Sequence, residues 1–389
     1  MEILSCENVA FKYNESTDYA ISDCTFSVKK GEKIMLCGAS GSGKSTLLRL
    51  LKRELSPRGE LSGNITLMGK DRSELSDRES AEKIGFVMQS PDSQTVCDKV
   101  SAELAFGLES FGVKSGEIQS RVGEMAAFFG IESLYDRDIS TLSGGQKQLV
   151  ALCSVMATDP DILLLDEPTA QLDPVAAREL LGILDRLNKE MGVTIIIAEH
   201  DPEELFDSCD KILYLANGKT EFFGTPTLTA KYFVKNALEG FLPETAKAFA
   251  RLCDDLPLNV RQGRAKFEKL GVTDIPKQAV TDTERVEPYA LQCKNLWQRY
   301  EKNSPDILKG CDLSIRKGEC YGLLGSNGGG KSTLLRVICG LCKPYMGTVS
   351  LFGKKQKAYK NGSLFREMLA FLPQEPVTMF VKESVREDL

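Results

Sequence analysis

Two copies of a phosphate-binding sequence pattern, far apart in a chain of 389 residues, constrain the fold most. Residues 38–46 read GASGSGKST and residues 325–333 read GSNGGGKST, so both fit the pattern G-x-x-x-x-G-K-[ST]. The glycines of such a loop (P-loop) let successive backbone N–H groups point at phosphate oxygens. The pattern therefore predicts an α/β fold around each copy, with a nucleotide as the ligand.

The residues on either side of both loops fit a strand before the loop and a helix after it. Residues 34–37 and 320–324 are short and mostly apolar, as expected for a buried strand. Leucines follow each loop at helical spacing, within residues 45–55 and 332–342. Strand, glycine loop and helix in this order are the context in which the pattern binds phosphate.

Two further residue types recur at matching distances from each loop, which indicates a duplicated domain. Tyr13 and Tyr300 each precede the lysine of the following loop by 31 positions. Gln89 and Gln374 follow those lysines by 45 and 43 positions, and each ends an apolar stretch. A chain of this length usually contains more than one core. Two long copies indicate duplicated domains rather than a solenoid of short repeats.

Composition excludes several classes of protein. No apolar run approaches the roughly 18 residues that cross a bilayer, and residues 1–10 lack the features of a signal peptide. The net charge is −6 without a block of Lys or Arg, which argues against nucleic acid as the main ligand. The twelve cysteines show no regular framework and are expected to stay reduced. Cys339 and Cys342 form a lone C-x-x-C pair, which we expect to pack in the interior.

Acidic residues and the single histidine follow two further apolar runs in the first half of the chain. Residues 162–165 precede Asp166 and Glu167, and residues 194–198 precede Glu199 and His200. Fully apolar runs of this length predict central parallel strands. Open α/β sheets bind ligands at the carboxyl ends of their strands, so these side chains are expected near the phosphates.

One more segment makes the likeness to a known family specific. Residues 142–146 read LSGGQ and lie between the first loop and the acidic strand. With the other motifs, this segment resembles the signature peptide of the ATP-binding-cassette (ABC) ATPases, across the whole first domain. The resemblance implies a P-loop fold with a central, mainly parallel sheet, an antiparallel β subdomain and a helical subdomain that carries the signature. The residues that match the family, in their order along the chain, are Tyr13, residues 38–46, Gln89, residues 142–146, residues 165–169, residues 172–173 and His200.

Shorter matches are similar to the ATPases of energy-coupling-factor (ECF) transporters, which import vitamins and transition-metal ions. They are residues 88–94 (MQSPDSQ), 103–108 (ELAFGL) and 198–201 (AEHD). Some members of that group carry two fused cassettes in one chain. The resemblance implies a peripheral protein at the cytoplasmic face of the cell membrane. Its expected partners are a transmembrane coupling protein, a substrate-binding membrane subunit and a second ABC ATPase chain or homodimer copy, without nucleic acid.

Residue chemistry gives the first site its physical basis. Tyr13 offers a flat ring on which adenine can stack. Lys44 neutralises charge on the transferred phosphoryl group, and Glu167 is expected to orient or activate water. The resemblance implies that His200 contacts the γ-phosphate and that Gln89 senses the γ-phosphate or Mg²⁺. The expected catalytic residues are Glu167, His200, Gln89 and Lys44.

ATP is the expected substrate and Mg²⁺ the expected cofactor. Ser45 and Asp166 are expected to hold Mg²⁺ between the β and γ oxygens, together with Gln89. The corresponding ligands of the second copy are Ser332 and Gln374. In the first copy, the expected ATP-binding residues are Tyr13, Gly38, Ser40, Gly41, Gly43, Lys44, Ser45, Thr46, Ser143 and Gly145. In the second copy they are Tyr300, Gly325, Asn327, Gly328, Gly330, Lys331, Ser332 and Thr333.

The signature segment implies that two cassettes work together. In the family, the segment with Ser143 and Gly145 opens a helix whose N–H groups meet the γ-phosphate bound by the opposite domain. Binding of two ATP molecules then closes two cassettes head to tail, and hydrolysis reopens them. The membrane partner is expected to dock beside Gln89, over residues 95–113, in contact with Glu103 and Ala105.

We expect three parts along the chain. Residues 1–225 form the first nucleotide-binding domain, and residues 226–288 form a small helical extension and linker, with helices near 241–256 and 261–270. Residues 289–389 form the N-terminal part of a second nucleotide-binding domain, truncated after Gln374. This copy has a P-loop but no signature peptide, acidic strand or histidine. Its P-loop strand should therefore have an unpaired edge and an exposed apolar face.

Other functions of the same fold are less consistent with the residues. Tandem cassettes that act on ribosomes have long basic linkers, whereas residues 226–288 contain ten Lys and Arg against nine Asp and Glu. DNA-repair ATPases contain a long coiled coil, and residues 47–140 show no heptads. A nucleotide-gated subunit that does not hydrolyse ATP remains an alternative because the second copy is incomplete.

Overall fold

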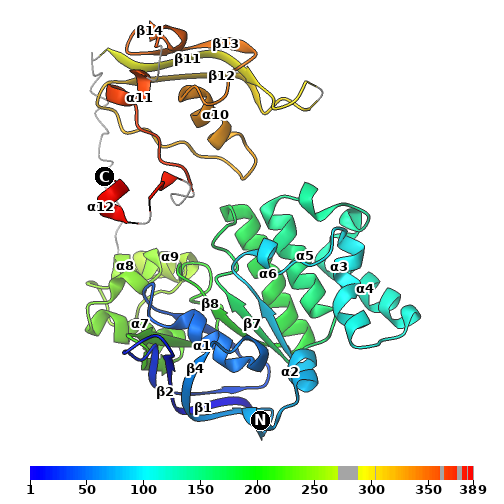
Figure 1. Cartoon of the computed structure of the whole chain (residues 1–389). Coiled ribbons are helices and arrows are strands. Elements are labelled where there is room, and N and C mark those ends of the chain that lie inside the picture. The colour runs from blue at the N-terminus through cyan, green and yellow to red at the C-terminus, as the bar shows by residue number, and fades with distance from the viewer. Residues whose placement is uncertain (270–287, 303, 360–362, 375–378, 383, 389) are drawn as a thin grey trace. The chain divides into compact units, whose positions relative to one another are not determined.

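The computed structural model describes the chain except residues 270–287, 303, 360–362, 375–378, 383 and 389. The chain divides into two compact units, Met1–Pro276 and Lys277–Leu389. Figure 1 shows the elements of both units along the chain. None of the helices in the described ranges is long and apolar enough to cross a membrane.

An antiparallel sheet opens the first unit, with the strand order β2-β1-β4-β5. Cys6 of β1 pairs with Phe26 on one side and with Ile65 on the other, and all three side chains are buried. One face of this sheet therefore lies in the core, in agreement with the antiparallel subdomain predicted from the resemblance. The strands are β1 (Glu2–Tyr13), β2 (Ile21–Lys29), β4 (Gly59–Leu67) and β5 (Lys70–Asp71).

A six-stranded sheet forms the centre of the first unit, in the order β10-β9-β3-β8-β7-β6. Every neighbouring pair is parallel except β9 with β10. The predicted apolar strands at residues 34–37, 162–165 and 194–198 are confirmed as β3, β7 and β8, which are buried along their whole length. The strands are β3 (Lys33–Cys37), β6 (Ile84–Val87), β7 (Ile162–Asp166), β8 (Thr194–Ala198), β9 (Lys211–Ala216) and β10 (Lys219–Gly224).

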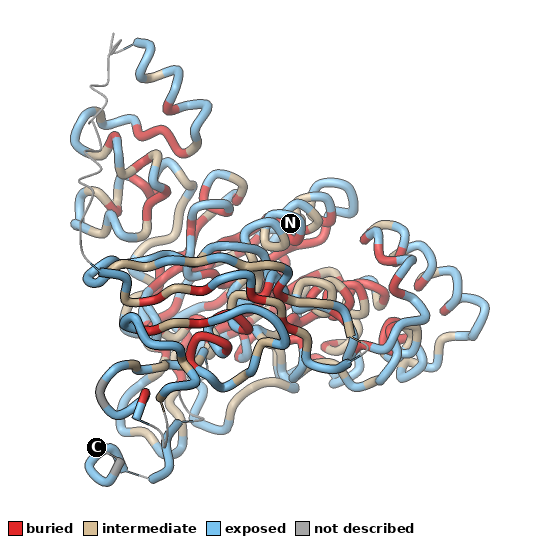
Figure 2. Tube along the Cα trace, turned by 90° about the horizontal axis from the view of Figure 1, so that it is seen from above, coloured by how far each residue is buried: buried red, intermediate tan, exposed pale blue. Residues whose placement is uncertain are grey.

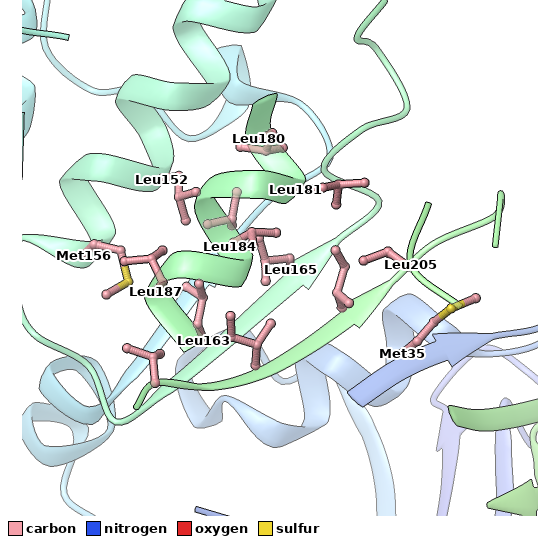
Figure 3. Close-up of a cluster of buried hydrophobic side chains, with 14 of the residues drawn as sticks. Met35, Leu152, Met156, Leu163, Leu165, Leu180, Leu181, Leu184, Leu187 and Leu205 are labelled. Carbon is pink, nitrogen blue, oxygen red and sulfur yellow. The ribbon is translucent and has the colours of Figure 1, made fainter. Parts of the chain in front are cut away.

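The central sheet is covered on both faces, which explains why its strands are apolar without alternation. Leu163 and Leu165 of β7 pack with helices α5 and α6, as Figure 3 shows for the surrounding leucines. Ile162 and Leu164 point to the other face, into a core shared with α1 and the antiparallel sheet. Figure 2 colours the chain by burial, with buried residues in red and exposed residues in pale blue.

Helices surround the central sheet, and α3, α4 and α5 gather on one side of it (Figure 1). The helix α6 begins at the N-cap Asp173, whose carboxylate accepts two backbone N–H groups, and ends at Gly192 with a φ of 70°. Both features are helix signals written in the sequence. The helices are α1 (Lys44–Leu51), α2 (Asp77–Lys83), α3 (Val100–Ser110), α4 (Ser115–Phe129), α5 (Gly144–Met156) and α6 (Pro174–Met191).

Three short helices follow β10 and pack on the first unit. Phe233 of α7 (Pro226–Lys235) and Phe249 of α8 (Glu244–Phe249) belong to the same core as α5 and α6. The next helix is α9 (Val260–Lys269). The predicted helix at 241–256 is therefore shorter than expected, and the prediction did not include α7. Pro is favoured at the first position of a helix, where α7 has it.

The second unit contains a smaller antiparallel sheet, with the order β12-β11-β13-β14, and α10 (Lys331–Ile338) packs on it. Leu334 and Val337 of α10 share a core with Leu291, Val349 and Leu351 of the sheet. The remaining elements are β11 (Tyr289–Gln298), β12 (Leu308–Arg316), β13 (Met346–Leu351), β14 (Lys354–Lys355), α11 (Ser363–Glu367) and α12 (Val385–Asp388).

The prediction of a strand at residues 320–324 is wrong, whereas the expected exposure of apolar side chains there is confirmed. This segment has no regular structure, Tyr321 is 55% exposed and Leu324 is 92% exposed. In the first unit, the corresponding strand β3 lies between β8 and β9, whereas no strand pairs with residues 320–324 among the described residues of the second unit. A strand needs a neighbour for its backbone hydrogen bonds, so apolar composition alone does not form one. Residues 369–374 lack a strand for the same reason.

Candidate functional site

The first P-loop is shaped by glycines that no other residue could replace. A Cβ atom at Gly38 would lie 2.2 Å from the carbonyl oxygen of Leu215. Gly43 has a φ of 103° and starts helix α1. Lys44 is 5% exposed, and its Nζ donates to the carbonyl oxygens of Gly38 at 2.8 Å and Ala39 at 3.3 Å. The lysine therefore lies across the loop, where phosphates would meet the helix N-terminus.

A hydroxyl and a carboxylate meet at the start of α1. Ser45 Oγ donates to Asp166 Oδ1 at 2.7 Å, and Asp166 is 4% exposed at the end of β7. Because β7 and β3 both pair with β8, the sheet brings the acidic strand end to the P-loop. Mg²⁺ prefers oxygen ligands of these two kinds, so the pair fits the expected metal.

Glu167 lies at the centre of the side-chain contacts of the site. Its Oε2 accepts a hydrogen bond from Gln89 Nε2 at 3.0 Å, and its Oε1 lies 3.9 Å from Lys44 Nζ. Its φ is 48°, in the left-handed region, and its N–H donates to the carbonyl oxygen of Ala198. Such a backbone conformation costs about 1–3 kcal/mol and is typical of functional sites. The structure thus joins Glu167, Gln89 and Lys44, which lie far apart in sequence.

Glu199 and Thr169 form a contact that sequence reasoning missed. Glu199 Oε1 accepts hydrogen bonds from Thr169 N at 3.1 Å and Thr169 Oγ1 at 2.7 Å, and the side chain is 4% exposed. Burial raises the pKa of Glu199 to about 7, and the charge of Glu167 adds to this rise, while hydrogen bonds from Thr169 and from the His200 backbone lower it. An acidic residue after a fully apolar strand was the available signal. His200 follows with an exposed side chain.

Tyr13 lies beside the first turn of α1. Its hydroxyl and Thr46 Oγ1 are 2.9 Å apart, and its ring packs edge-on against Phe11 with 5.0 Å between centroids. The half-buried ring is thereby held next to the P-loop. This position suits the expected stacking of adenine, which stays a prediction.

The signature segment forms the N-terminus of α5. Ser143 is the N-cap: its Oγ accepts from Gln146 N at 3.3 Å, and its own N–H donates to Gln146 Oε1 at 3.0 Å. Gly145 leaves little room for a side chain, since a Cβ there would lie 3.1 Å from Ala176 Cβ. Within the described part of the chain, neither residue hydrogen-bonds to residues 38–46. The exposed start of α5 is therefore free to meet a second cassette.

The segment after Gln89 is held from two sides. Gln94 Oε1 accepts from Met88 N at 2.9 Å, and Gln94 Nε2 donates to the carbonyl oxygen of Phe86 at 3.1 Å. Asp92 forms an ion pair of 2.6 Å with Lys147 of α5. The segment therefore connects the end of β6 to the helix that carries the signature, and sequence reasoning assigned no role to these three side chains.

The expected docking surface needs one correction. Glu103 is 5% exposed, and its Oε2 accepts hydrogen bonds from the backbone N–H groups of Val96 at 3.0 Å and Cys97 at 2.9 Å. It therefore holds the loop from inside and does not face a partner, so the expected contact of Glu103 with the membrane partner is wrong. The exposed apolar side chains of this region are Val96 (67%) and Phe106 (43%), and Ala105 is half-buried.

The second P-loop repeats the local contacts of the first. Lys331 Nζ donates to the carbonyl oxygens of Gly325 at 2.6 Å and Ser326 at 2.8 Å. The hydroxyls of Tyr300 and Thr333 are 3.1 Å apart. A hollow of about 610 Å³ lies beside this loop and is lined by Tyr300, Asp306, Ile307, Lys309, Gly328 and Gly329, among others.

The other residues expected at the second site are less well placed. Ser332 is exposed, and Gln374 lies in a segment without regular structure. Within the described residues of the second unit, no carboxylate pairs with Lys331 or accepts a hydrogen bond from Ser332. Cys339 is buried and Cys342 packs partly against the core, where we expected them. The described residues contain no group of three or more His, Cys, Asp and Glu side chains that could hold a metal by themselves.

The amino-acid sequence is similar to a known protein family and to individual proteins of other organisms. The sequence profile of the ABC transporter family matches residues 21–170 and 308–388. A candidate ABC transporter ATP-binding protein of Bacillus thuringiensis subsp. konkukian (strain 97-27) is 38% identical over 384 residues, which are 98% of this chain and 69% of that protein. A similar candidate of Methanosarcina mazei is 34% identical over 407 residues, covering 98% of this chain and 68% of that protein.

Solved structures agree with the fold. CbiO1 from Clostridium perfringens, part of the ABC transporter complex CbiONQ, superposes with a TM-score of 0.55 at 33% identity, over 61% of this chain and 94% of CbiO1. The dimeric cassette MJ0796, in a post-hydrolysis state with ADP and Pi, superposes with a TM-score of 0.51 at 27% identity, over 58% of this chain and 99% of that one. The predicted fold, a mainly parallel sheet with antiparallel and helical subdomains, is confirmed.

Proposed function

Because the chain belongs to the ABC transporter family of ATP-hydrolysing cassettes, we propose that it energises a membrane importer of the ECF type. The likeness to CbiO1 carries this proposal, since it spans 94% of a cassette that is part of the complex CbiONQ. The ECF-like segments at residues 88–94, 103–108 and 198–201 support it. The imported compound would be a vitamin or a transition-metal ion, chosen by a separate membrane subunit. The chain would then sit peripherally at the cytoplasmic face of the membrane.

Hydrolysis is proposed to occur at the first P-loop. Ser45 and Asp166 would hold Mg²⁺, which would supply positive charge to the phosphate oxygens. Glu167 would accept a proton from the attacking water as the bond from the water oxygen to the γ-phosphorus forms and the bond from that phosphorus to the leaving oxygen of ADP breaks. Lys44 and His200 would stabilise the charge that develops on the transferred phosphoryl group. The contacts of Glu167 with Gln89 and Lys44 support this arrangement.

A second cassette is needed to complete such a site. Ser143 and the exposed start of α5 would bind the γ-phosphate held by the opposite cassette. That cassette would come from a second copy of this chain, from another ABC ATPase or from a fused domain that begins near residue 289. The dimeric state of MJ0796 with ADP and Pi supports a two-cassette arrangement by analogy. Specific activity that rises with protein concentration would identify a pairing of separate chains.

The membrane partner is proposed to dock on the surface formed by residues 95–113. Val96 and Phe106 expose apolar side chains there, as the binding of a partner helix requires. The bond between Gln89 and Glu167 links this surface to the site of hydrolysis. Closure of the cassettes could therefore be passed to the partner by a short path.

Site-specific crosslinking tests this proposal. A photoreactive residue at Val96 or Phe106 should capture an integral membrane protein in native membranes, and the yield should change when ATP is added. Leu61 is a matched control, because it is an exposed apolar residue (40%) on the antiparallel sheet. Capture of ribosomal proteins would instead favour a translation-associated cassette. Equal capture of the membrane protein from Leu61 would contradict the placement of the surface.

A further inference from the structure

One buried carboxylate at the first site has no part in the mechanism above. Glu199 ends the ladder of β8, with its N–H bonded to the carbonyl oxygen of Leu36, and His200 follows it. We propose that Glu199 is a positioning residue that holds Glu167 and His200 in place for ATP hydrolysis. This inference rests on the roles proposed for Glu167 and His200, and Glu199 itself touches no reacting atom.

The hydrogen bonds of Glu199 join the two segments that carry those residues. Thr169, which donates through its N–H and its hydroxyl, comes two residues after Glu167. The backbone of His200, the next residue, lies near the same carboxylate and lowers its pKa. A single side chain at the end of β8 thus receives two donors from the segment that follows β7. Because Glu167 has a left-handed backbone, its orientation depends on such support from the residues that follow it.

An acidic group is an unusual choice at this buried position. Desolvation disfavours its charge, and nearby Glu167 repels it, which together raise the pKa of Glu199 to about 7. A neutral Gln, Ser or Thr could accept a hydrogen bond without this penalty. The ionised carboxylate, however, accepts both donors of Thr169 at once, and bonds to a charged acceptor are stronger. The arrangement therefore favours close positioning over stability.

The same chemistry gives turnover a dependence on pH. Below about pH 7 the carboxyl group becomes protonated, turns one acceptor into a donor and loosens its hold on Thr169 and His200. Turnover should then fall with falling pH. Stability should move the other way, because a carboxyl with a raised pKa destabilises the folded chain as pH rises from about 4.5 to about 7. The titratable neighbours on the adjoining strand ends are Asp166 at the end of β7 and Glu167 after it, Cys37 at the end of β3 and Lys44 after it, and His200 and Asp201 on the same segment.

Two variants of the full chain test the proposal through kcat, KM for ATP and their pH profiles. Glu199→Gln keeps one acceptor but loses the charge, so kcat should fall about 10-fold to 100-fold while KM stays within about threefold. In this variant, the decrease of turnover as the pH falls below about 7 (the acid-side fall) should disappear, although His200 is unchanged. Thr169→Val removes a hydrogen bond that lowers the pKa of Glu199, so the acid-side fall should move to higher pH.

The matched control is Glu32→Gln. Glu32 also accepts a backbone N–H, from Lys29 at 2.8 Å, and its carboxylate pairs with Lys211 at 3.0 Å. Its carbonyl oxygen bonds to Ile195 N, at the opposite end of β8, so it is remote from the strand ends of the site. This variant should keep the wild-type kcat and pH profile.

A wild-type kcat and pH profile in Glu199→Gln would overturn the proposal. So would an equal loss of kcat in Glu199→Gln and Glu32→Gln, since that would indicate a general effect on folding. Should the Gln variant fail to fold, an unchanged acid-side fall in Thr169→Val would overturn the proposal by itself. All readouts use ATP hydrolysis alone, so this inference can fail while the import function stands, and the reverse is equally possible.

Discussion

The two P-loops of this chain have nearly the same sequence and the same local contacts, yet their surroundings differ. In both, the lysine Nζ donates to two carbonyl oxygens of its own loop. In both, a tyrosine hydroxyl also contacts the hydroxyl of the threonine that lies two positions after that lysine. Among the described residues, only Lys44 has a carboxylate within ion-pair distance, that of Glu167 at 3.9 Å, and Asp166 bonds to the neighbouring Ser45; both carboxylates come from the end of β7 and the residue after it. The comparison teaches that a phosphate-binding loop is built locally, whereas a hydrolytic site needs neighbouring strands.

Removing the carboxylate of Glu167, the residue directly after β7, is expected to have the largest effect and is the first test of this comparison. Glu167→Gln should keep ATP affinity near wild type and slow turnover by on the order of 10² to 10⁴, because the attacking water loses its base. ATP binding by titration and phosphate release under saturating ATP measure the two effects. Glu204→Gln is a control on an exposed carboxylate that pairs with Arg178. Turnover above a tenth of wild type in a complete complex would remove Glu167 from the role of base.

The segment before each loop, a strand in the first unit only, offers the second test, through stability. Leu36 of β3 is fully buried, so Leu36→Ala should cost about 2–5 kcal/mol of the free energy of unfolding. Leu324→Ala should change it by less than about 0.5 kcal/mol, since Leu324 is 92% exposed. Urea unfolding followed by circular dichroism measures both values. A large cost at Leu324 would mean that residues 320–324 pack against something in solution, and the contrast between the units would weaken.

Sequence reasoning succeeded where a few consecutive residues determine the structure. The glycine loops, the helices after them and the apolar strands β7 and β8 follow from residue type and spacing. It failed at residues 320–324, because a strand forms only beside another strand, and the composition of one segment does not contain that information.

The candidate site divides in the same way. The residues of the P-loop, Asp166, Glu167 and Gln89 could be named from motifs, and the structure joins them by hydrogen bonds. The hydrogen bond from Thr169 to Glu199 could not be predicted from the sequence, because it depends on how the ends of two strands are aligned in space. Glu103 was misjudged for a related reason: it was placed on the docking surface by its position in the sequence, whereas its carboxylate accepts two backbone N–H groups inside.

The lysines of the two loops provide the third test. Lys44→Ala should weaken ATP binding at the first loop by about 10-fold to 100-fold, since a hydrogen bond to a charged group contributes about 1.5–3 kcal/mol, and turnover should fall with it. Lys331→Ala should weaken binding at the second loop by a similar factor and leave turnover within about threefold of wild type. Calorimetry resolves the two binding events, and a coupled assay follows turnover. Equal losses of turnover in both variants would show that both loops drive hydrolysis.

The smallest expected effect concerns a contact that occurs once within each unit, between a tyrosine and a threonine hydroxyl. The hydroxyl pairs Tyr13 with Thr46 and Tyr300 with Thr333 are 2.9 Å and 3.1 Å apart. Replacing either threonine by valine removes the hydrogen bond and keeps the shape. Each change should therefore cost about 0.5–1.5 kcal/mol of local stability.

Hydrogen exchange of the amides of α1 and α10, without nucleotide, measures this cost in each unit separately. Thr46→Ser and Thr333→Ser are the controls, because they keep the hydroxyl. If the loops are built locally, the two valine variants should lose protection by the same factor, although β3 is buried in one unit and residues 320–324 are exposed in the other. If the valine variant lost amide protection at α1 but not at α10, the surrounding strands would also determine the contacts of the P-loop. The distinction between a locally built loop and a site that needs neighbouring strands would then no longer hold.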